Sequence, residues 1–186
     1  MQCVTKKDFE CLAKHKEVHY INKKTYCDVK HRWQYVKEAV RIVNTEQPTS
    51  VLELGPFFTR DGKPFPIVKG SDTFDCRSST TTYCRSATDI PWPMVNKQYD
   101  LFIALQVWEH LEGKQKEAFA EVARVANKAI LSFPYKIKGK STDIHANIDD
   151  GQIVEWTFGL EPANKIVVVD NRTRPATRRI VCFFKF

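Results

Sequence analysis

The sequence predicts a single α/β domain, in which a doubly wound, mostly parallel sheet carries helices on both faces. The run QYDLFIALQV at 98–107 is almost continuously apolar and has the length of a strand, which is typical of a strand covered on both sides. A helical pattern at 113–127 and the apolar segment KAILSFP at 128–134 follow it, and this strand, helix, strand order favours a parallel crossover. The two strand-like segments that end the chain indicate an antiparallel C-terminal hairpin.

The length and composition fit one soluble domain. A chain of 186 residues is large enough for one well-filled core and too short for two comfortable domains. Its 42% hydrophobic and 27% charged residues are ordinary for a soluble protein. No apolar run approaches the roughly 20 residues of a membrane-spanning helix, and the opening MQCVTKKDFE lacks the apolar centre of a secretory signal. We therefore expect a cytoplasmic protein without a membrane partner.

Cysteine spacing and charge add two weaker constraints. The six cysteines include no pair separated by two residues, so free thiols are favoured over a disulfide framework or a structural zinc. The net charge of +7 is uneven, with lysines crowded into the first 40 residues and arginines near the end. This charge favours anionic partners, although solvated surface charge explains it equally well.

Residues 1–31 are expected to form a helical arm or lid outside the sheet. This segment holds a short amphipathic piece, DFECLAKHKEVHY, followed by the polar stretch NKKTYCDVK. Residues 32–44 then predict a helix, because their apolar residues recur at three- and four-residue intervals and give it one buried stripe. Gln47, Pro48 and Thr49 end this helix.

The sheet is expected to begin with SVLELG at 50–55, a short strand of branched and long apolar residues that stops at a glycine. Residues 56–70 contain three prolines and two glycines, which exclude a regular helix and predict an ordered loop. A second short strand is expected in SDTFD at 71–75. The last expected elements are a helix at 149–158 and strands in NKIVVVD at 164–170 and RRIVCFFKF at 178–186.

The residues that follow the predicted strands are candidates for a ligand site, because ligands of open α/β sheets bind beyond the carboxyl ends of the strands. They are Glu53, Gly55 and Pro56 after the first strand, Asp75 after the second, Asp89 in the third connection, and Gln106 to His110 after the fourth. Asp72 is an alternative to Asp75, since strand ends inferred from sequence are uncertain by about 2–4 residues.

Four motifs occur in one order along this pattern. They are VLELGP at 51–56, TFD at 73–75, SATDIPWP at 86–93 and YDLFIALQVWEHLE at 99–112. Together they resemble the first-strand, second-strand, adenine-contacting and fourth-strand motifs of the Rossmann-like (class I) S-adenosylmethionine-dependent methyltransferases. The resemblance spans roughly residues 50–135, and the C-terminal hairpin agrees with the family's antiparallel seventh strand. One departure is the segment after Gly55, PFFTRDGKPFP, which lacks the family's further glycines and predicts a loop in place of its first helix.

The resemblance implies S-adenosylmethionine as the cofactor. It implies that Asp75, or Asp72 in its place, accepts hydrogen bonds from the ribose hydroxyls. Asp89 would accept one from the adenine amino group, and Ile90 would wall the ring. Glu53 would organise the loop or meet the cofactor's ammonium group. As alternatives, Asp75 is a surface or capping aspartate and Glu53 is a structural carboxylate. The implied cofactor-binding residues are Glu53, Gly55, Pro56, Asp72, Asp75, Asp89, Ile90 and Gln106.

The candidate catalytic residues come from the turns after the fourth and fifth strands. Methyl transfer needs positioning and exclusion of water, and a base only where the acceptor must lose a proton. His110 is the best candidate base, since imidazole titrates near neutral pH, and Glu109 would assist it. As an alternative, this Glu-His pair caps the next helix and fixes the turn.

His145 is expected on the same edge of the sheet, either beside this pair or in a polar loop. The residues expected to line an acceptor pocket with it are Tyr135, Asp149 and Trp156. A metal held by His110, His145 and Asp149 has no local ligand spacing to support it, so no metal is predicted.

The predicted acceptor is a small molecule, with an anionic group as a further expectation from the positive charge. A nucleic acid is an alternative that the basic ends of the chain would serve, but an Asn/Asp-Pro-Pro-aromatic segment is missing after the fourth strand. A non-catalytic binding or regulatory module is a second alternative, which the missing glycines favour. A nicotinamide-dependent dehydrogenase is disfavoured because GxGxxG is absent. In the favoured interpretation, residues 32–186 form the methyltransferase domain.

Overall fold

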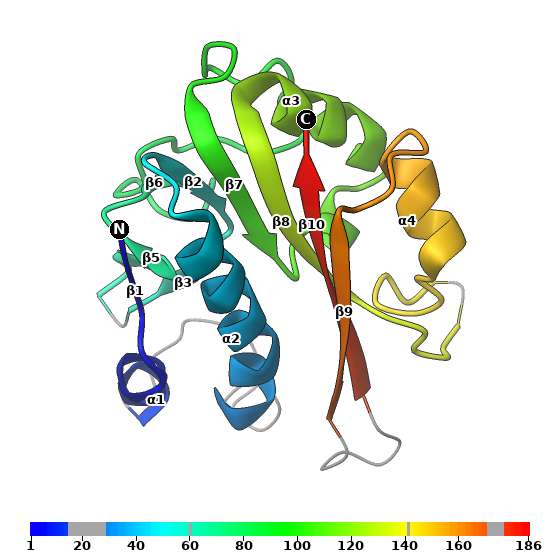
Figure 1. Ribbon diagram of the computed structural model, residues 1–186, viewed down its shortest axis with the longest axis horizontal. Helices are drawn as coiled ribbons and strands as arrows, with labels where there is room; N and C mark the ends of the chain where they lie inside the picture. The colour runs from blue at the N-terminus through cyan, green and yellow to red at the C-terminus, as the bar shows by residue number, and fades with distance from the viewer. Residues whose placement is uncertain (15–28, 60, 141, 171–176) are drawn as a thin grey trace.

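A six-stranded mixed sheet forms the centre of the protein (Figure 1). The computed structural model describes residues 1–14, 29–59, 61–140, 142–170 and 177–186. The strands lie in the order β6-β2-β7-β8-β10-β9. Their bounds are β2 (Val51–Leu54), β6 (Asp72–Phe74), β7 (Tyr99–Leu105), β8 (Ala126–Pro134), β9 (Asn164–Asp170) and β10 (Thr177–Lys185). The neighbours β6, β2, β7 and β8 are parallel, and β10 is antiparallel to both β8 and β9.

The remaining elements surround this sheet. Two small antiparallel pairs join β1 (Gln2–Cys3) to β5 (Val68–Lys69) and β3 (Phe57–Phe58) to β4 (Pro64–Phe65). The helices are α1 (Lys6–Lys14), α2 (Val29–Glu46), α3 (Gln115–Val125) and α4 (Asp150–Trp156), with a 3₁₀ turn, η1, at Trp108–His110. None of the helices in the described ranges has the length and apolarity that crossing a bilayer requires.

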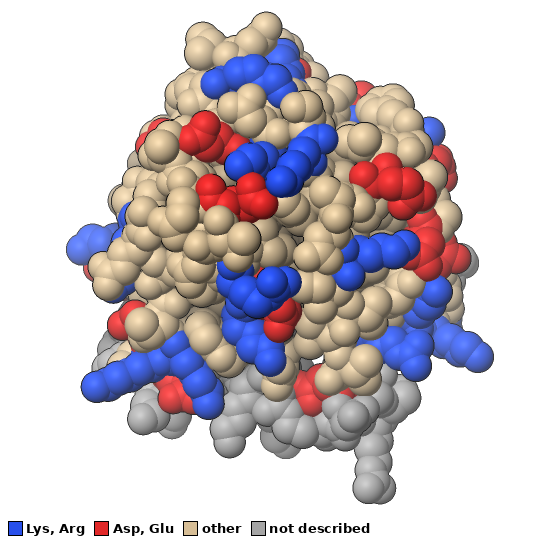
Figure 2. Space-filling model, viewed as in Figure 1, with Lys and Arg blue, Asp and Glu red and all other residues tan. Residues whose placement is uncertain are grey.

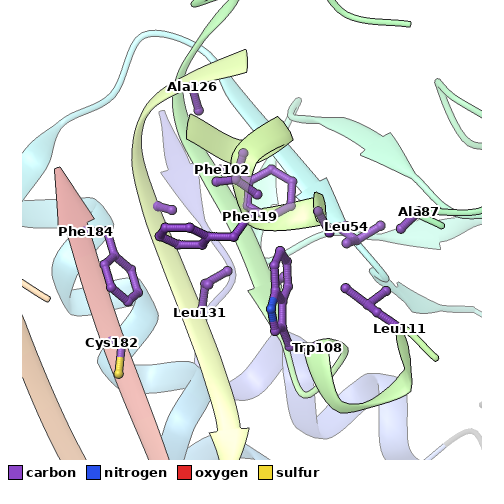
Figure 3. Close-up of a cluster of buried hydrophobic side chains, with 14 of the residues drawn as sticks. Leu54, Ala87, Phe102, Trp108, Leu111, Phe119, Ala126, Leu131, Cys182 and Phe184 are labelled. Atoms are coloured by element: carbon purple, nitrogen blue, oxygen red, sulfur yellow. The ribbon is translucent and has the colours of Figure 1, made fainter. Parts of the chain in front are cut away.

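Helices cover both faces of the sheet, as the sequence predicts. Along β7, Leu101 and Ile103 are buried in one apolar cluster with side chains of α2, whereas Phe102 and Ala104 are buried in a second cluster with side chains of α3. Figure 3 shows the second cluster, where Phe119 of α3 lies against the strands. The continuous apolar run at 98–107 therefore has the predicted cause: alternate side chains enter two different cores.

Several predicted bounds shift by a few residues, and one region has more structure than predicted. The helix predicted at 32–44 extends over α2, and the helix predicted at 113–127 is α3. Residues 56–70 were predicted as loop, yet they contain the pair β3 and β4 and the strand β5. Pairs of two-residue strands carry too short a pattern to be detected, because periodicity needs a longer window.

The described part of the predicted N-terminal arm is packed against the domain. Strand β1 pairs with β5, and α1 contacts α2. Val4 and Phe9 are 3% and 2% exposed, and both belong to the core cluster of α2. Residues 15–28 of the arm lie outside the described residues, and closure of the arm over a site stays a prediction. The five cysteines in the described ranges are free thiols, of which Cys182 is buried.

Candidate cofactor and active site

Gly55 brings the ends of three parallel strands together. It follows β2, and its backbone N–H donates to the carbonyl of Phe74 at the end of β6, at 3.0 Å. Its φ of +66° is a left-handed conformation that favours glycine, and a Cβ there would lie 2.5 Å from Cγ2 of Val107, just after β7. A side chain at position 55 would therefore have to displace Val107 and would strain the backbone.

Glu53 holds the loop that follows. The side chain is buried, and its Oε2 accepts a hydrogen bond of 2.7 Å from the backbone N–H of Ile67. Burial raises the pKa of this carboxyl to about 8, although hydrogen bonds from the backbone of Ile67 and Val68 oppose the rise. Of the two roles expected for Glu53, the contacts in the structure are those of a residue that organises the loop.

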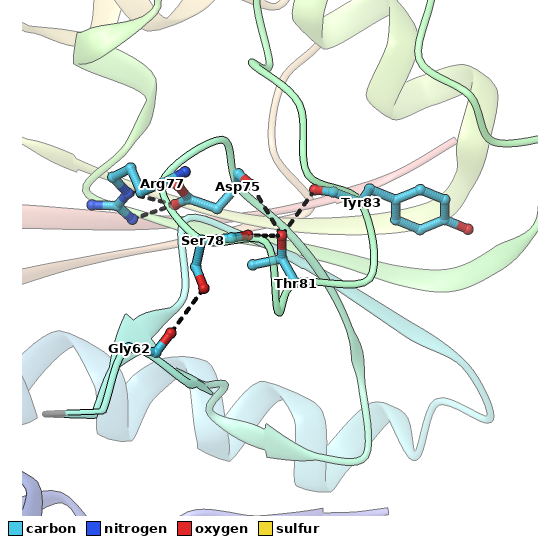
Figure 4. A network of polar contacts seen from close by, with 6 residues as sticks. All are labelled: Gly62, Asp75, Arg77, Ser78, Thr81 and Tyr83. Atoms are coloured by element: carbon cyan, nitrogen blue, oxygen red, sulfur yellow. Dashed lines mark hydrogen bonds and ion pairs between the residues drawn. The ribbon is translucent and has the colours of Figure 1, made fainter.

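Asp75 lies one residue beyond β6 and is 6% exposed. Figure 4 shows its carboxylate facing the guanidinium of Arg77. Nε of Arg77 donates to Oδ1 at 2.6 Å and to Oδ2 at 2.8 Å, and Nη2 forms a further ion pair with Oδ2. The same guanidinium lies 5.0 Å from the ring centroid of Phe58. The carboxylate is thus fixed at the carboxyl edge of the sheet, with its charge balanced by its own neighbour.

Asp72, the alternative to Asp75, is at the wrong edge of the sheet. It is the first residue of β6, and its Oδ2 accepts a hydrogen bond of 2.7 Å from the hydroxyl of Tyr99, the first residue of β7. Because β6 and β7 run parallel to β2, both residues lie at the amino ends of the strands. Asp72 therefore lies away from the carboxyl edge, and Asp75 is the residue that we retain for the proposed ribose contact.

Asp89 and Ile90 are exposed on the long connection from β6 to β7. The backbone N–H of Asp89 closes a turn by donating to the carbonyl of Ser86 at 3.1 Å. Close by in the chain, Trp92 is buried, and its ring centroid lies 5.2 Å from that of Phe74 at the end of β6. This packing holds the connection beside the end of β6, and the predicted adenine contacts stay a prediction.

The turn after β7 begins at Gln106, whose φ of +57° is left-handed. Its backbone N–H donates to the carbonyl of Ser132 at 3.0 Å, and its side-chain Nε2 donates to Oγ of the same serine at 3.2 Å. The 3₁₀ turn η1 follows at once and directs Trp108 into the core, where its exposure is 0%. Its two remaining residues, Glu109 and His110, are thereby fixed just beyond the sheet.

Glu109, His110 and His145 form one cluster, although they come from two separate turns. One ligand atom of each residue lies within 4.8 Å of the other two. Oε1 of Glu109 is 3.6 Å from Nδ1 of His145, and the centroids of the two imidazole rings are 5.0 Å apart. Oε2 of Glu109 is buried and has no hydrogen-bond partner in the described ranges. The three residues predicted to be catalytic are therefore brought together, and the carboxylate beside the histidines is Glu109 rather than Asp149.

The two histidines of this cluster have opposite electrostatic environments. Desolvation of the ring lowers the pKa of His110, and the charges of His145 and Arg77 lower it further against the opposing effect of Glu109. The nearby carboxylate of Glu109 raises the pKa of His145. The influence of Arg77 on His110 also links the cluster to the ion pair at Asp75, because the same guanidinium acts on both.

The residues expected around the acceptor have structural contacts of their own. The hydroxyl of Tyr135 donates to Oδ2 of Asp150 at 2.6 Å. Asp149 is the N-cap of α4, where its Oδ1 accepts a hydrogen bond of 3.0 Å from the backbone N–H of Gln152. Trp156 packs with its ring centroid 5.9 Å from that of Phe133. These contacts explain all three residues, and their contact with an acceptor stays a prediction.

Two residues of this region were missed by sequence reasoning. Arg77 follows Asp75 at a spacing of two residues, and that spacing was the available signal for an ion pair. Val107 leaves little room for a side chain at position 55. The sequence carries no signal for this contact, because it joins segments that are distant in the chain.

No protein-family model and no curated protein sequence matches this chain. Solved structures of methyltransferases do match. N-methyltransferase NodS from Bradyrhizobium japonicum WM9 is 14% identical with a TM-score of 0.60, and the match covers 85% of this chain and 97% of that one. The N-terminal domain of EvdMO1, solved with SAH and D-fucose, is 10% identical with a TM-score of 0.52, over 98% and 97% of the two chains. The methyltransferase domain of bacterial CtHen1-CN is 13% identical with a TM-score of 0.50, over 83% and 99%.

The chain therefore has the fold of the Rossmann-like methyltransferases. Its sheet is mostly parallel, and β10 is antiparallel to both β8 and β9, which agrees with the antiparallel C-terminal hairpin strand that the sequence predicts. The resemblance stated from those motifs is confirmed at the level of the fold.

Proposed function

We propose that this protein is an S-adenosylmethionine-dependent methyltransferase that acts on a small-molecule acceptor. One observation carries the proposal. In a sheet with the methyltransferase fold, Gly55, Asp75 and the Glu109–His110–His145 cluster occupy the turns that follow neighbouring parallel strands. Ligands of open α/β sheets bind at this edge.

The cofactor end of the site depends on Asp75. A buried carboxylate one residue past β6 fits the two hydroxyls of a ribose, and each hydrogen bond to a charged acceptor contributes about 1.5–3 kcal/mol. Arg77 already donates to both oxygens of the Asp75 carboxylate. The ribose hydroxyls would therefore either displace the guanidinium or share the carboxylate with it. The other residues proposed to contact the cofactor are Gly55, Pro56, Asp89, Ile90 and Gln106, and Glu53 supports them by holding the loop.

The acceptor end of the site depends on the Glu109–His110–His145 cluster. S-adenosylmethionine supplies an electrophilic methyl group on a sulfonium sulfur. The residues of this chain orient the acceptor and exclude water from it, which provides most of the acceleration in such a displacement. His110 and His145 are placed to take the proton of an acceptor that must lose one, and Glu109 orients His145 through their contact of 3.6 Å.

A small molecule is favoured over a nucleic acid as the acceptor. Figure 2 shows that Lys and Arg are interspersed with Asp and Glu on the face in view, rather than gathered into the continuous basic band that a phosphate backbone requires. The EvdMO1 domain with the same fold was solved with D-fucose, a small sugar. The net charge of +7 still favours an acceptor with an anionic group. The cytoplasmic location expected from the sequence stays a prediction.

Isothermal titration calorimetry with S-adenosylmethionine and S-adenosylhomocysteine tests the cofactor site. We expect wild type to bind both compounds and Asp75→Asn to bind them at least about tenfold more weakly, because one charged acceptor is lost. Asp72→Asn is the matched control at the opposite edge and should bind as wild type does. The proposal is overturned if wild type binds neither compound, and the site is wrong if Asp75→Asn binds normally.

A measurement of turnover shows whether the protein is an enzyme or a non-catalytic binding module. Formation of S-adenosylhomocysteine would be measured with the low-mass fraction and, separately, with the nucleic-acid fraction of a cell extract. We expect product with the low-mass fraction, and less of it with Asp75→Asn when the S-adenosylmethionine concentration is below saturation. Product with nucleic acid alone would reverse the choice of acceptor, and binding without any product would favour the regulatory module.

A further inference from the structure

We propose that Glu109, His110 and His145 bind one divalent transition-metal ion. Glu109 and His110 are the last two residues of η1, and His145 lies in the turn before α4. Their ligand atoms all lie within 4.8 Å of one another. Two imidazole nitrogens and one carboxylate oxygen are a ligand set that binds Zn²⁺, Co²⁺ or Fe²⁺ in proteins, whereas Mg²⁺ and Ca²⁺ prefer oxygen ligands throughout.

The spacing of the donor atoms suits such an ion better than it suits direct hydrogen bonds. Oε1 of Glu109 and Nδ1 of His145 are 3.6 Å apart, which is longer than a well-formed hydrogen bond. Ligand atoms at about 2.0–2.1 Å from a tetrahedral ion are roughly 3.3 Å from each other. The Glu109–His145 pair is therefore close to the separation of two ligands of one ion, and the ligand atoms of the whole cluster, which lie within 4.8 Å of one another, would move closer on binding.

The buried oxygen of Glu109 is an independent observation that points to a ligand. The Glu109 side chain is 1% exposed, and Oε2 has no hydrogen-bond partner in the described part of the chain. A buried polar group without a partner costs about 1–3 kcal/mol, and more when it is charged. The contact with His145 involves Oε1, so it leaves Oε2 unsatisfied, and a bound cation would satisfy the carboxylate.

Hydrogen bonds of the backbone N–H groups hold the two turns that carry these residues. The N–H of His110 donates to the carbonyl of Val107 at 2.9 Å, and the buried Trp108 anchors η1 in the core. The N–H of His145 donates to Oδ1 of Asp143 at 2.9 Å, which holds the second turn. Preorganised ligands of this kind lose little conformational entropy on binding.

The charges that face the cluster are compatible with a divalent cation. Arg77 and Arg179 bring positive charge toward the two imidazoles, and Glu109 and Asp143 bring negative charge. The charge of Arg77 is already balanced by Asp75, with which it forms an ion pair. A divalent cation at this position would therefore lie beside two carboxylates, those of Glu109 and Asp143.

Three protein ligands leave at least one coordination position open. This position is where an oxygen of the methyl acceptor would bind, and this part of the inference rests on the proposed function. A metal-bound hydroxyl has a strongly lowered pKa, so the ion would favour an acceptor with an oxygen nucleophile. With the ion bound, the two imidazoles would act as ligands in place of the base role proposed above, and the metal-bound hydroxyl would release its proton to solvent.

Titration of the metal-free full chain with Co²⁺, followed by calorimetry and visible absorption, tests the site. We expect one ion per chain and a spectrum without the bands of thiolate ligands. Glu109→Gln, His110→Asn and His145→Asn should each weaken binding by at least about tenfold, because each removes a ligand. Glu112→Gln, an exposed carboxylate in the same turn, is the matched control and should bind as wild type does.

His145→Asn carries the most weight, because its side chain is 45% exposed and its loss should leave the fold intact by circular dichroism. Absence of stoichiometric Co²⁺ binding, or unchanged binding in the His145 variant, would overturn the proposal, as would equally tight binding of Mg²⁺. Calorimetry with S-adenosylmethionine is independent of this result. If the protein binds S-adenosylmethionine but no Co²⁺, only the metal-site proposal is wrong. If it binds Co²⁺ but no S-adenosylmethionine, only the proposed methyltransferase function is wrong.

Discussion

Glu53 illustrates how one buried residue couples the loop at 56–70 to the ionisation of the protein. Its side chain is inside the domain, and its carboxylate accepts a hydrogen bond from the backbone of Ile67. The cost of burying a charge raises its pKa to about 8 from an ordinary value of 4.5. At neutral pH the folded protein therefore holds a proton here that the unfolded chain has lost.

This difference gives a stability change with a definite sign. Between pH 4.5 and 8 the unfolded state releases the Glu53 proton and the folded state retains it, so the free energy of unfolding falls as pH rises. The slope from this one group approaches roughly 1 kcal/mol per pH unit. Glu53→Gln keeps an acceptor for Ile67 and cannot ionise, so the stability of wild type relative to this variant should decrease from pH 5 to pH 8 by roughly 2 kcal/mol or more.

Urea denaturation of both proteins at pH 5, 6.5 and 8 measures this difference. The comparison cancels the other titrating groups, because both proteins contain them. Parallel pH profiles for the two proteins would show that Glu53 ionises normally in the folded state.

At the scale of elements, the close approach of the β2 end to the turn after β7 fixes the geometry of the site. The approach depends on Gly55, where a Cβ would meet Val107 at 2.5 Å in a left-handed backbone conformation. By contrast, Gly62 has a similar φ of +76° and nothing within 4 Å of its Cβ position. A substitution at Gly62 would therefore show the effect of backbone strain alone, whereas a substitution at Gly55 would show strain and the steric contact with Val107 together.

We expect Gly55→Ala to destabilise the protein by about 2–4 kcal/mol, from strain of about 1 kcal/mol and from overpacking of about 1–3 kcal/mol. Gly62→Ala should show the strain alone. Val107→Ala in the Gly55→Ala background should recover part of the loss, and a double-mutant cycle of unfolding free energies would measure that coupling. Equal losses for the two glycine variants would contradict the contact with Val107.

Long elements were predictable from periodicity, and very short ones were not. The strands β7 and β8 and the helix α3 lie where the sequence predicts them, because each repeats its apolar pattern over seven or more residues. The pair β3 and β4 has two residues in each strand, and its position depends on neighbours distant in sequence. Phe57, for example, packs edge-on against Phe9 at 5.0 Å between ring centroids.

At the scale of the whole molecule, the N-terminal segment is a part of the core. Phe9 of α1 is 2% exposed and lies between the rings of Trp33 and Phe57, at centroid distances of 5.8 and 5.0 Å. It therefore joins α1 to α2 and to the loop after β2. This arrangement predicts that the described arm contributes to global stability rather than moving as a detached lid.

Phe9→Ala should lower the free energy of unfolding by about 3–5 kcal/mol, the usual result of removing a buried aromatic ring. Phe158, which is 65% exposed, provides the matched control, and Phe158→Ala should change stability by no more than about 0.5 kcal/mol. Chemical denaturation followed by circular dichroism measures both. A loss below 1 kcal/mol for Phe9→Ala would show that α1 can leave the core at little cost.

The sequence alone determined the order of the elements, the doubly wound sheet with its antiparallel C-terminal strand, and the turns in which site residues would lie. These properties are local, because periodicity, glycine and proline act within a short window of chain. It also placed Asp75, Glu109, His110 and His145 in turns at the carboxyl edge of the sheet, since every parallel strand ends there.

Only the tertiary structure decided which of these side chains meet. In the folded protein Glu109 lies beside His145, and Asp75 forms an ion pair with Arg77. Asp72 lies at the opposite edge of the sheet, and Asp149 is the N-cap of α4. The physical reason is that such contacts depend on strand register and on loop packing between residues far apart in the chain. A difference of three residues along one strand reverses the edge at which a carboxylate lies.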